Sequence, residues 1–296
     1  MITVQDAFKK FRSRLELTEG EQADASRRQQ DIRALMDDAF AIEKDFLTGS
    51  YARWTKTKPL KDVDIFCVLN DEERGYRSKP PSNLLMAVEN NLAKKYGQDN
   101  VSRQRRSVTV NFGVQEVNGE TNDQVMSFDV VPAFTKDNHY EIPDTAQLSG
   151  WTATDPQIHY ELAVRANEAY AGEWKGIVRM MKSWNRLNDK PVKPSFLIEV
   201  MALQILHPPF GGDYRYEMKG FFASLADRIG DRWPDPAGLG PDVSDSMDPE
   251  RSRAAKEKLC QAVQQAAQAI QTERQGKQGE ALGIWRGLFG PLFPLS

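Results

Sequence analysis

The chain has 296 residues, of which 40% are hydrophobic and 27% charged, and this balance excludes wholesale disorder and allows one or two sizeable cores. Lys and Arg total 39 against 42 Asp and Glu, for a net charge of −3, which argues against tight binding of duplex nucleic acid through general charge. Two cysteines exclude a disulfide framework, and no Cys/His cluster has the spacing of a zinc site.

No stretch of the sequence has the length and apolarity of a membrane span. The longest mostly apolar run extends only from Phe196 to Leu206 and is interrupted by Glu199 and Gln204. The first residues lack the charged-then-apolar order of a signal peptide. We therefore expect a cytoplasmic protein without a membrane segment, and we expect Glu199 to pair with a basic residue rather than to act in catalysis.

The first half of the chain changes from helical to strand periodicity. Apolar residues recur at helical spacing over residues 3–42, with a break near Thr18, which predicts two amphipathic helices or one bent helix. Asp62 to Leu69 alternates and predicts a strand whose odd-numbered residues share one face. Residues 84–96 return to helical spacing, and the alternating segments 107–117 and 124–131 predict two further strands.

The second half is predicted to be helical almost throughout. Asp155 followed by Pro156 is a helix N-cap with proline at the first helical position. Helices are expected over 156–170, 174–188, 195–207, 215–230, 249–275 and 279–289. The fold class is therefore α+β, with a mixed sheet-and-helix lobe at 1–150 and an α-helical lobe at 151–296. The cleft between two such lobes is the default ligand site.

One set of residues carries a recognisable chemistry. Gly49 and Ser50 precede the pair Asp62 and Asp64, and Asp129 lies in a later predicted strand. Residues i and i+2 of a strand point to the same face about 6.6 Å apart, so the pair presents two carboxylates side by side. Such close negative charges need a cation, and Mg²⁺ prefers carboxylate oxygens together with substrate phosphates. A third carboxylate from another strand completes a two-metal site for phosphoryl or nucleotidyl transfer.

The Gly-Ser pair is a plausible seat for phosphates. Gly49 permits close approach of the backbone, and Ser50 offers a hydroxyl and a backbone amide. Competing nucleotide motifs are absent, since the sequence has no Gly-x4-Gly-Lys-Ser/Thr loop, and Gly238-Leu-Gly240 lacks the third glycine of a dinucleotide fingerprint.

The segment from Gly49 to Ile65, GSYARWTKTKPLKDVDI, resembles the signature of the DNA-polymerase-beta-like nucleotidyltransferases. Its Gly-Ser-Tyr-x-Arg-x-Thr sequence pattern is similar to that of the bacterial cyclic-oligonucleotide synthases (CD-NTases). These enzymes are related to animal cyclic GMP-AMP synthase and oligoadenylate synthase. The resemblance extends over nearly the whole chain, from the N-terminal helices through the Asp129 strand to a helical lobe that ends in Trp285 to Gly290. It implies a polymerase-beta-like lobe, an α-helical second lobe and a central active-site cleft.

The resemblance also implies residues of the second lobe. Lys182, in the predicted helix from Trp174 to Asn185, matches the family's lysine that reaches the donor triphosphate, and Ser195 matches the serine at the start of the following helix. An ammonium neutralises phosphate charge, and a hydroxyl at a helix start adds a donor to an anion. Phe196, with Tyr51 as the alternative, is a candidate for stacking on a base, because stacking does not require a particular base.

The resemblance implies an enzyme that condenses ribonucleoside triphosphates (ATP, GTP or pyrimidine nucleotides) into a cyclic di- or trinucleotide second messenger, with release of pyrophosphate. Two Mg²⁺ ions, or Mn²⁺ in their place, are the expected cofactors. Asp62 and Asp64 would hold both ions, and Asp129 would hold the catalytic one and accept the proton of the attacking hydroxyl. The product is expected to activate a separate effector in antiphage (CBASS-type) defence, with regulation by a protein partner or a metabolite.

Three other readings use the same residues. A linear 2′-5′ oligoadenylate synthase needs the same three carboxylates, as does a transferase that adds a nucleotide to a tRNA, a protein or a drug. A nucleotide-binding pseudoenzyme is the non-enzymatic alternative, and the presence of Asp62, Asp64 and Asp129 argues against it. Motif spacing does not decide the bases, the linkage, the ring size, the activating signal, the oligomeric state or the effector.

Overall fold

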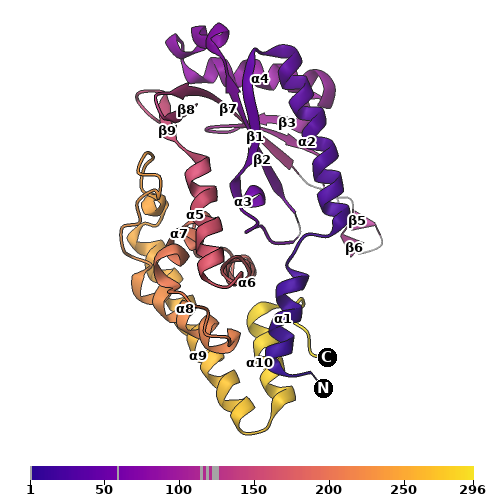
Figure 1. Cartoon of the computed structure of the whole chain (residues 1–296), viewed down its shortest axis with the longest axis vertical. Helices are drawn as coiled ribbons and strands as arrows, with labels where there is room; N and C mark the ends of the chain where they lie inside the picture. Colours follow the sequence, from indigo (N-terminus) through magenta and orange to yellow (C-terminus); the bar gives the residue numbers. More distant parts are fainter. Residues whose placement is uncertain (1, 59, 114–115, 118–119, 122–126) are drawn as a thin grey trace. The chain divides into compact units, whose positions relative to one another are not determined.

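The structure is a computed structural model that describes residues 2–58, 60–113, 116–117, 120–121 and 127–296. The chain divides into two compact units: a sheet unit, Leu17–Tyr160, and a helical unit that combines Met1–Glu16 with Glu161–Ser296. Figure 1 shows the strands gathered in the sheet unit. This division differs from the predicted boundary at residue 150, because the segment Met1–Glu16 belongs to the helical unit and the second boundary falls after Tyr160.

The sheet unit is built on a mixed seven-stranded sheet with the strand order β1-β2-β7-β4-β3. Strand β8 pairs with β7 and with β9. The central pair β2 and β7 is parallel, and the pairs on either side of it are antiparallel. The strands are β1 (Ile42–Thr48), β2 (Asp62–Leu69), β3 (Val101–Arg103), β4 (Val108–Asn111), β7 (Ser127–Lys136), β8 (His139–Pro143) and β9 (Trp151–Thr154), with a separate pair of β5 (Glu116–Val117) and β6 (Glu120–Thr121).

The alternation of β2 gives its two faces different surroundings. The odd-numbered residues Val63 to Leu69 are buried in a core shared with helices α2 (Glu19–Ala39) and α4 (Pro81–Tyr96), which confirms the predicted apolar face. The even-numbered residues therefore point to the other face, where Phe66 packs in a second, smaller core with residues of β7 and β8. Asp62 and Asp64 belong to this second face.

Local signals in the sequence set the helix boundaries of the sheet unit. Thr18 and Glu21 form a capping box that starts α2, which explains the predicted break between the first two helices. Pro81 occupies the first turn of α4, where its missing N–H costs nothing. The helices are α2 (Glu19–Ala39), the single turn α3 (Gly49–Ala52), α4 (Pro81–Tyr96), and the 3₁₀ segments η1 (Asp71–Ser78) and η2 (Gln98–Asn100). In Figure 1, α2 and α4 lie against the sheet.

The helical unit buries its apolar residues in one continuous core. Helix α1 belongs to it because Phe8 packs edge-on against Trp285 and Phe293 at the other end of the chain. The helices are α1 (Val4–Arg14), α5 (Pro156–Ala169), α6 (Trp174–Leu187), α7 (Phe196–Ile205), α8 (Tyr214–Arg228), α9 (Pro249–Arg274) and α10 (Gln278–Phe289), with η3 (Val243–Ser246). Helix α5 starts in the sheet unit and ends in the helical unit.

The observed elements confirm the α+β class and the helices expected after residue 155. The predicted strand over 107–117 is divided into β4 and β5, and that over 124–131 starts at Ser127. Residues 114–115 and 124–126 of these predictions lie outside the described residues. Strands β1, β3, β8 and β9 were not predicted individually. In the part of the chain that the structure describes, no helix combines the length and apolarity needed to cross a membrane.

Candidate active site

The register of two parallel strands brings the three predicted aspartates to one face of the sheet. Asp64 of β2 lies directly opposite Asp129 of β7. Residues paired in register point to the same face, as do residues two apart along a strand. Asp62 therefore shares this face with both of them. The sequence predicted the two strands, and their pairing makes neighbours of residues that are far apart along the chain.

The carboxylates raise one another's proton affinity. Burial raises the pKa of Asp64 to about 6, and the negative charges of Asp129 and Asp62 add to the effect. The pKa of Asp129 is also raised, mainly by burial. The hydroxyl of Thr109, opposite it on β4, donates a 2.5 Å hydrogen bond to its Oδ1 atom and opposes the increase. Both groups therefore bear a negative charge that the protein alone compensates poorly.

A lysine engages the third carboxylate. Nζ of Lys56 lies 2.6 Å from Oδ2 of Asp62, whose side chain is about half exposed. The same positive charge lowers the pKa of Asp64 and of Asp129. Lys56 thus supplies part of the positive charge that three neighbouring carboxylates require.

The backbone of Gly49 packs against the side chain of Asp64. It starts α3 with a φ of +67°, and a Cβ built on it would lie 1.7 Å from Oδ2 and 2.6 Å from Cγ of Asp64. Real Cβ atoms do not approach other heavy atoms closer than 3.0 Å, so only glycine fits this position. The group that the backbone of Gly49 approaches here is the carboxylate of Asp64, and the role of Gly49 in a phosphate seat stays a prediction.

The turn that carries Ser50 is held by backbone hydrogen bonds. The amide of Arg53 donates to the carbonyl of Gly49, and the amide of Thr55 donates to the carbonyl of Ser50. Thr55 is fully buried. The turn that follows β1 is therefore fixed by its own backbone hydrogen bonds, with Gly49 against Asp64.

The donor set suits a hard divalent cation. The described residues hold no group of three Asp, Glu, His or Cys side chains already arranged around one point as metal ligands, and Asp62 is engaged by Lys56. Carboxylate oxygens are nevertheless the ligands that Mg²⁺ prefers. A bound cation would remove the repulsion between Asp64 and Asp129. The chemistry of the three carboxylates therefore fits Mg²⁺.

The predicted residues of the second lobe lie in the helical unit. Lys182 of α6 is buried, and its Nζ atom lies 2.6 Å from Oε1 of Glu199, which is 2% exposed. The prediction that Glu199 pairs with a basic residue is confirmed. Ser195 is exposed at the N-cap position of α7 and makes no capping hydrogen bond with its side chain. Phe196 is half-buried against the helical core. The nucleotide-binding roles of these residues stay predictions.

Sequence reasoning missed two residues of the site. Thr109 reaches Asp129 only because β4 pairs with β7, and no local pattern indicates that pairing. Lys56 precedes Asp62 in a loop rich in lysine and threonine. Such a loop is typical of an exposed surface, so its pattern could not single out Lys56.

Residues 1–167 match the sequence profile of a family described as the Second Messenger Oligonucleotide or Dinucleotide Synthetase (SMODS) domain. A probable cyclic nucleotide synthase of Bacillus cereus (strain VD146) is 26% identical over 280 residues, which cover 83% of this chain and 81% of the relative. A cyclic AMP-AMP-AMP synthase of Acinetobacter sp. is 27% identical over 274 residues, which cover 85% of this chain and 73% of the relative.

A solved structure has the same fold over nearly the full length. CdnC of E. coli MS115-1, solved in complex with a HORMA protein, is 18% identical and covers 98% of both chains with a TM-score of 0.70. This likeness confirms the α+β fold class: a mixed sheet with helices, together with a helical part.

Proposed function

Since the chain belongs to the family of Second Messenger Oligonucleotide or Dinucleotide Synthetase domains, we propose that it joins ribonucleoside triphosphates into a cyclic di- or trinucleotide and releases pyrophosphate. The observation that carries the proposal is the register of Asp64 with Asp129 on neighbouring parallel strands, with Gly49 packed against Asp64. This arrangement gathers the carboxylates and the turn that starts at Gly49 at one face of the sheet.

The reaction forms one bond and breaks another at the same phosphorus. A ribose hydroxyl of the acceptor attacks the α-phosphorus of the donor, and the bond between that phosphorus and the leaving pyrophosphate breaks. We assign the hydroxyl proton to Asp129, which lies in register with Asp64 on the neighbouring strand. Thr109 holds one oxygen of that carboxylate through its hydrogen bond and so fixes its orientation.

Asp62 and Asp64 are assigned to two Mg²⁺ ions and Asp129 to one of them. When bound, the ions neutralise the charge that develops on the attacking and leaving oxygens. The role of the chain is to present the carboxylates from adjacent strands. Their burial and the repulsion between their negative charges favour the binding of a cation there. Mn²⁺ prefers the same oxygen ligands and is the expected substitute.

The donor triphosphate is assigned to the turn with Gly49 and Ser50 and to Lys182 and Ser195. The support for Lys182 and Ser195 is the family resemblance together with their residue types. Lys182 would exchange the carboxylate of Glu199, 2.6 Å away, for phosphate oxygens. Phe196 is assigned to base stacking, for which an aromatic ring at the start of a helix is suited.

The biological setting is proposed from the relatives. The Acinetobacter relative is a cyclic AMP-AMP-AMP synthase, which supports ATP as a substrate here, with GTP or a pyrimidine nucleotide as the other candidates. The complex of E. coli CdnC with a HORMA protein supports regulation by a protein partner. We assign the product to a separate effector in antiphage (CBASS-type) signalling in the cytoplasm.

The experiment is an incubation of the purified protein with all four ribonucleoside triphosphates and Mg²⁺ or Mn²⁺. The products are treated with phosphatase and identified by mass spectrometry. A phosphatase-resistant product of cyclic mass that is absent from the Asp62→Ala/Asp64→Ala variant is expected, and its mass identifies the bases. Linear products would indicate an oligoadenylate-type enzyme instead, and an unchanged product from the double variant would overturn the mechanism.

A further inference from the structure

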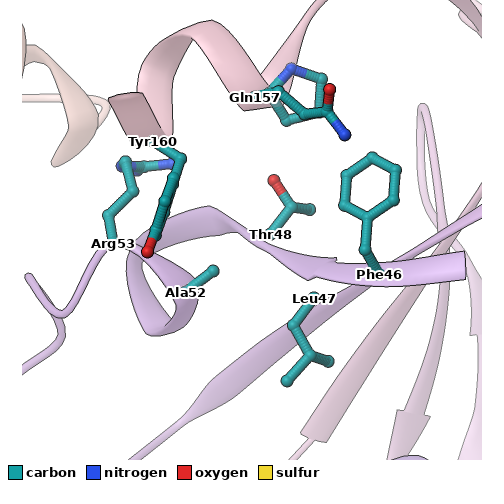
Figure 2. A pocket seen from close by; sticks show the side chains of 8 residues that line it. Phe46, Leu47, Thr48, Ala52, Arg53, Gln157 and Tyr160 are labelled. Carbon is teal, nitrogen blue, oxygen red and sulfur yellow. The ribbon is translucent and has the colours of Figure 1, made fainter. Parts of the chain in front are cut away.

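The sheet unit contains a pocket that the proposed mechanism does not use. The pocket has a volume of about 220 Å³ and is lined by residues of β1, α3 and its cap, and α5, all within the sheet unit. Figure 2 shows Tyr160 beside Arg53 on one side, Phe46 and Gln157 on the other, and Thr48 between them.

The pocket opens on the same face of the sheet as the aspartates. Phe46 and Thr48 are two residues apart on β1 and therefore point to one face, whereas Leu47 extends from the other side of the strand (Figure 2). Thr48 is paired in register with Asp64, so the two share that face. The pocket is thus a neighbour of the site on the outer strand, separate from the three carboxylates.

Helix α5 supplies the opposite wall in a fixed orientation. The carboxylate of Asp155 accepts a hydrogen bond from the amide of Gln157 and so anchors the first turn of the helix. Gln157 and Tyr160 are three residues apart and lie on the same face of α5. Both side chains are exposed at the pocket, and Tyr160 is 44% exposed although its ring is large and mostly apolar.

The lining groups match a flat heterocyclic ring. Tyr160 and Phe46 contribute two aromatic rings on opposite sides of the pocket, either of which can stack on such a molecule. The amide of Gln157 and the hydroxyl of Thr48 can each donate and accept a hydrogen bond at its edge. Stacking on an aromatic side chain, together with hydrogen bonds at the edge to groups that donate and accept, is how proteins hold bases. A purely aliphatic ligand would leave the amide and the hydroxyl unused.

We propose that this pocket binds a nucleobase, supplied either by a substrate nucleotide or by a free nucleoside that regulates the enzyme. The first source rests on the proposed function, and the second does not. The occupant would lie against Ala52 and Arg53, which end the turn that starts at Gly49. Arg53 donates its amide to the carbonyl of Gly49, so occupancy of the pocket bears directly on the turn that faces Asp64.

The test uses nucleosides, because they carry a base and no phosphate. Adenosine, guanosine, cytidine and uridine are titrated into the purified full-length protein in EDTA and followed by calorimetry. At least one nucleoside is expected to bind, with a dissociation constant that rises about tenfold or more in Tyr160→Ala and several-fold in Gln157→Leu. Matched controls are Tyr216→Ala, whose ring is also 44% exposed but on α8, and Gln264→Leu on α9. Both are expected to bind as the wild type does.

Competition separates the two sources. Displacement of the nucleoside by a nonhydrolysable nucleoside triphosphate with Mg²⁺ identifies the occupant as the base of a substrate, and simultaneous binding identifies a free regulator. The Asp62→Ala/Asp64→Ala variant should still bind the nucleoside, so failure of the proposed catalysis is distinguished from failure of the pocket. Absence of binding by all four nucleosides, or equal binding by the pocket variants and the wild type, would overturn the proposal.

Discussion

Replacement of Gly49 by alanine tests how closely the turn α3 packs against Asp64. The new Cβ would lie 1.7 Å from Oδ2 of Asp64, so these atoms must move apart to reach the 3.0 Å limit of real contacts. Rotation of the carboxylate alone does not relieve the clash, because Cγ is only 2.6 Å away. A misplacement of about 1 Å at reacting groups can cost about 100-fold in rate. We therefore expect Gly49→Ala to lower kcat by about 100-fold or more.

A control variant distinguishes the steric clash with Asp64 from the free-energy cost of placing alanine in a left-handed backbone conformation. Gly238 has a φ of +69°, close to the +67° of Gly49, but a Cβ there would meet no atom within 4 Å. Gly238→Ala therefore bears the same left-handed strain, about 1–2 kcal/mol, without displacing a carboxylate. Unfolding in urea should show a loss of that order for Gly238→Ala with normal synthesis of product. Wild-type kcat in Gly49→Ala, measured by pyrophosphate release, would refute the packing argument.

Three further predictions concern charges in and near the site. In EDTA, Asp64→Asn should stabilise the protein at pH 7.5 by at most about 3 kcal/mol and hardly at pH 4. The pKa of Asp64 is raised from 3.8 to about 6, so ionisation of this carboxyl costs folding stability as the pH rises between these values. An equal increase in the free energy of unfolding at both pH values, measured by urea denaturation, would contradict this. Thr109→Val removes the hydroxyl that lowers the pKa of Asp129, so the acidic limb of the pH–rate profile should move to higher pH. If the limb does not move, Thr109 does not set the pKa of Asp129 during the reaction. Glu199→Gln weakens the charge compensation of buried Lys182 and should cost roughly 3 kcal/mol of stability, whereas Lys182→Met should raise KM for the nucleotide well beyond that of Glu199→Gln. Equal KM values in the two variants would assign Lys182 a structural role.

The sequence predicted the elements that carry the site because each has a strong local signal. The alternation of Asp62 to Leu69 reflects one face buried against α2 and α4, and the helices after residue 155 follow from caps and helical spacing. The capping box at Thr18 marked the break between the first helices. In each of these cases, neighbours within a few residues determine the conformation.

What the sequence could not predict depends on contacts between distant segments. Helix α1 joins the helical unit through the packing of Phe8 on Trp285 and Phe293, which moves the predicted boundary. Thr109 acts on Asp129 only through strand register. The clash that makes Gly49 obligatory involves Asp64, which lies on a different element. Local patterns do not specify such pairings, because tertiary packing selects them.

The claim that carboxylates on adjacent strands hold the catalytic ions is tested most directly by counting bound Mn²⁺. Electron paramagnetic resonance follows a Mn²⁺ titration of the protein with a nonhydrolysable ATP analogue, with the analogue alone as the blank. Two protein-dependent ions are expected in the wild type, none in Asp62→Ala/Asp64→Ala, and weakened binding of one ion in Asp129→Ala. Equal Mn²⁺ binding by the wild type and the double variant would contradict the assignment of these carboxylates as metal ligands.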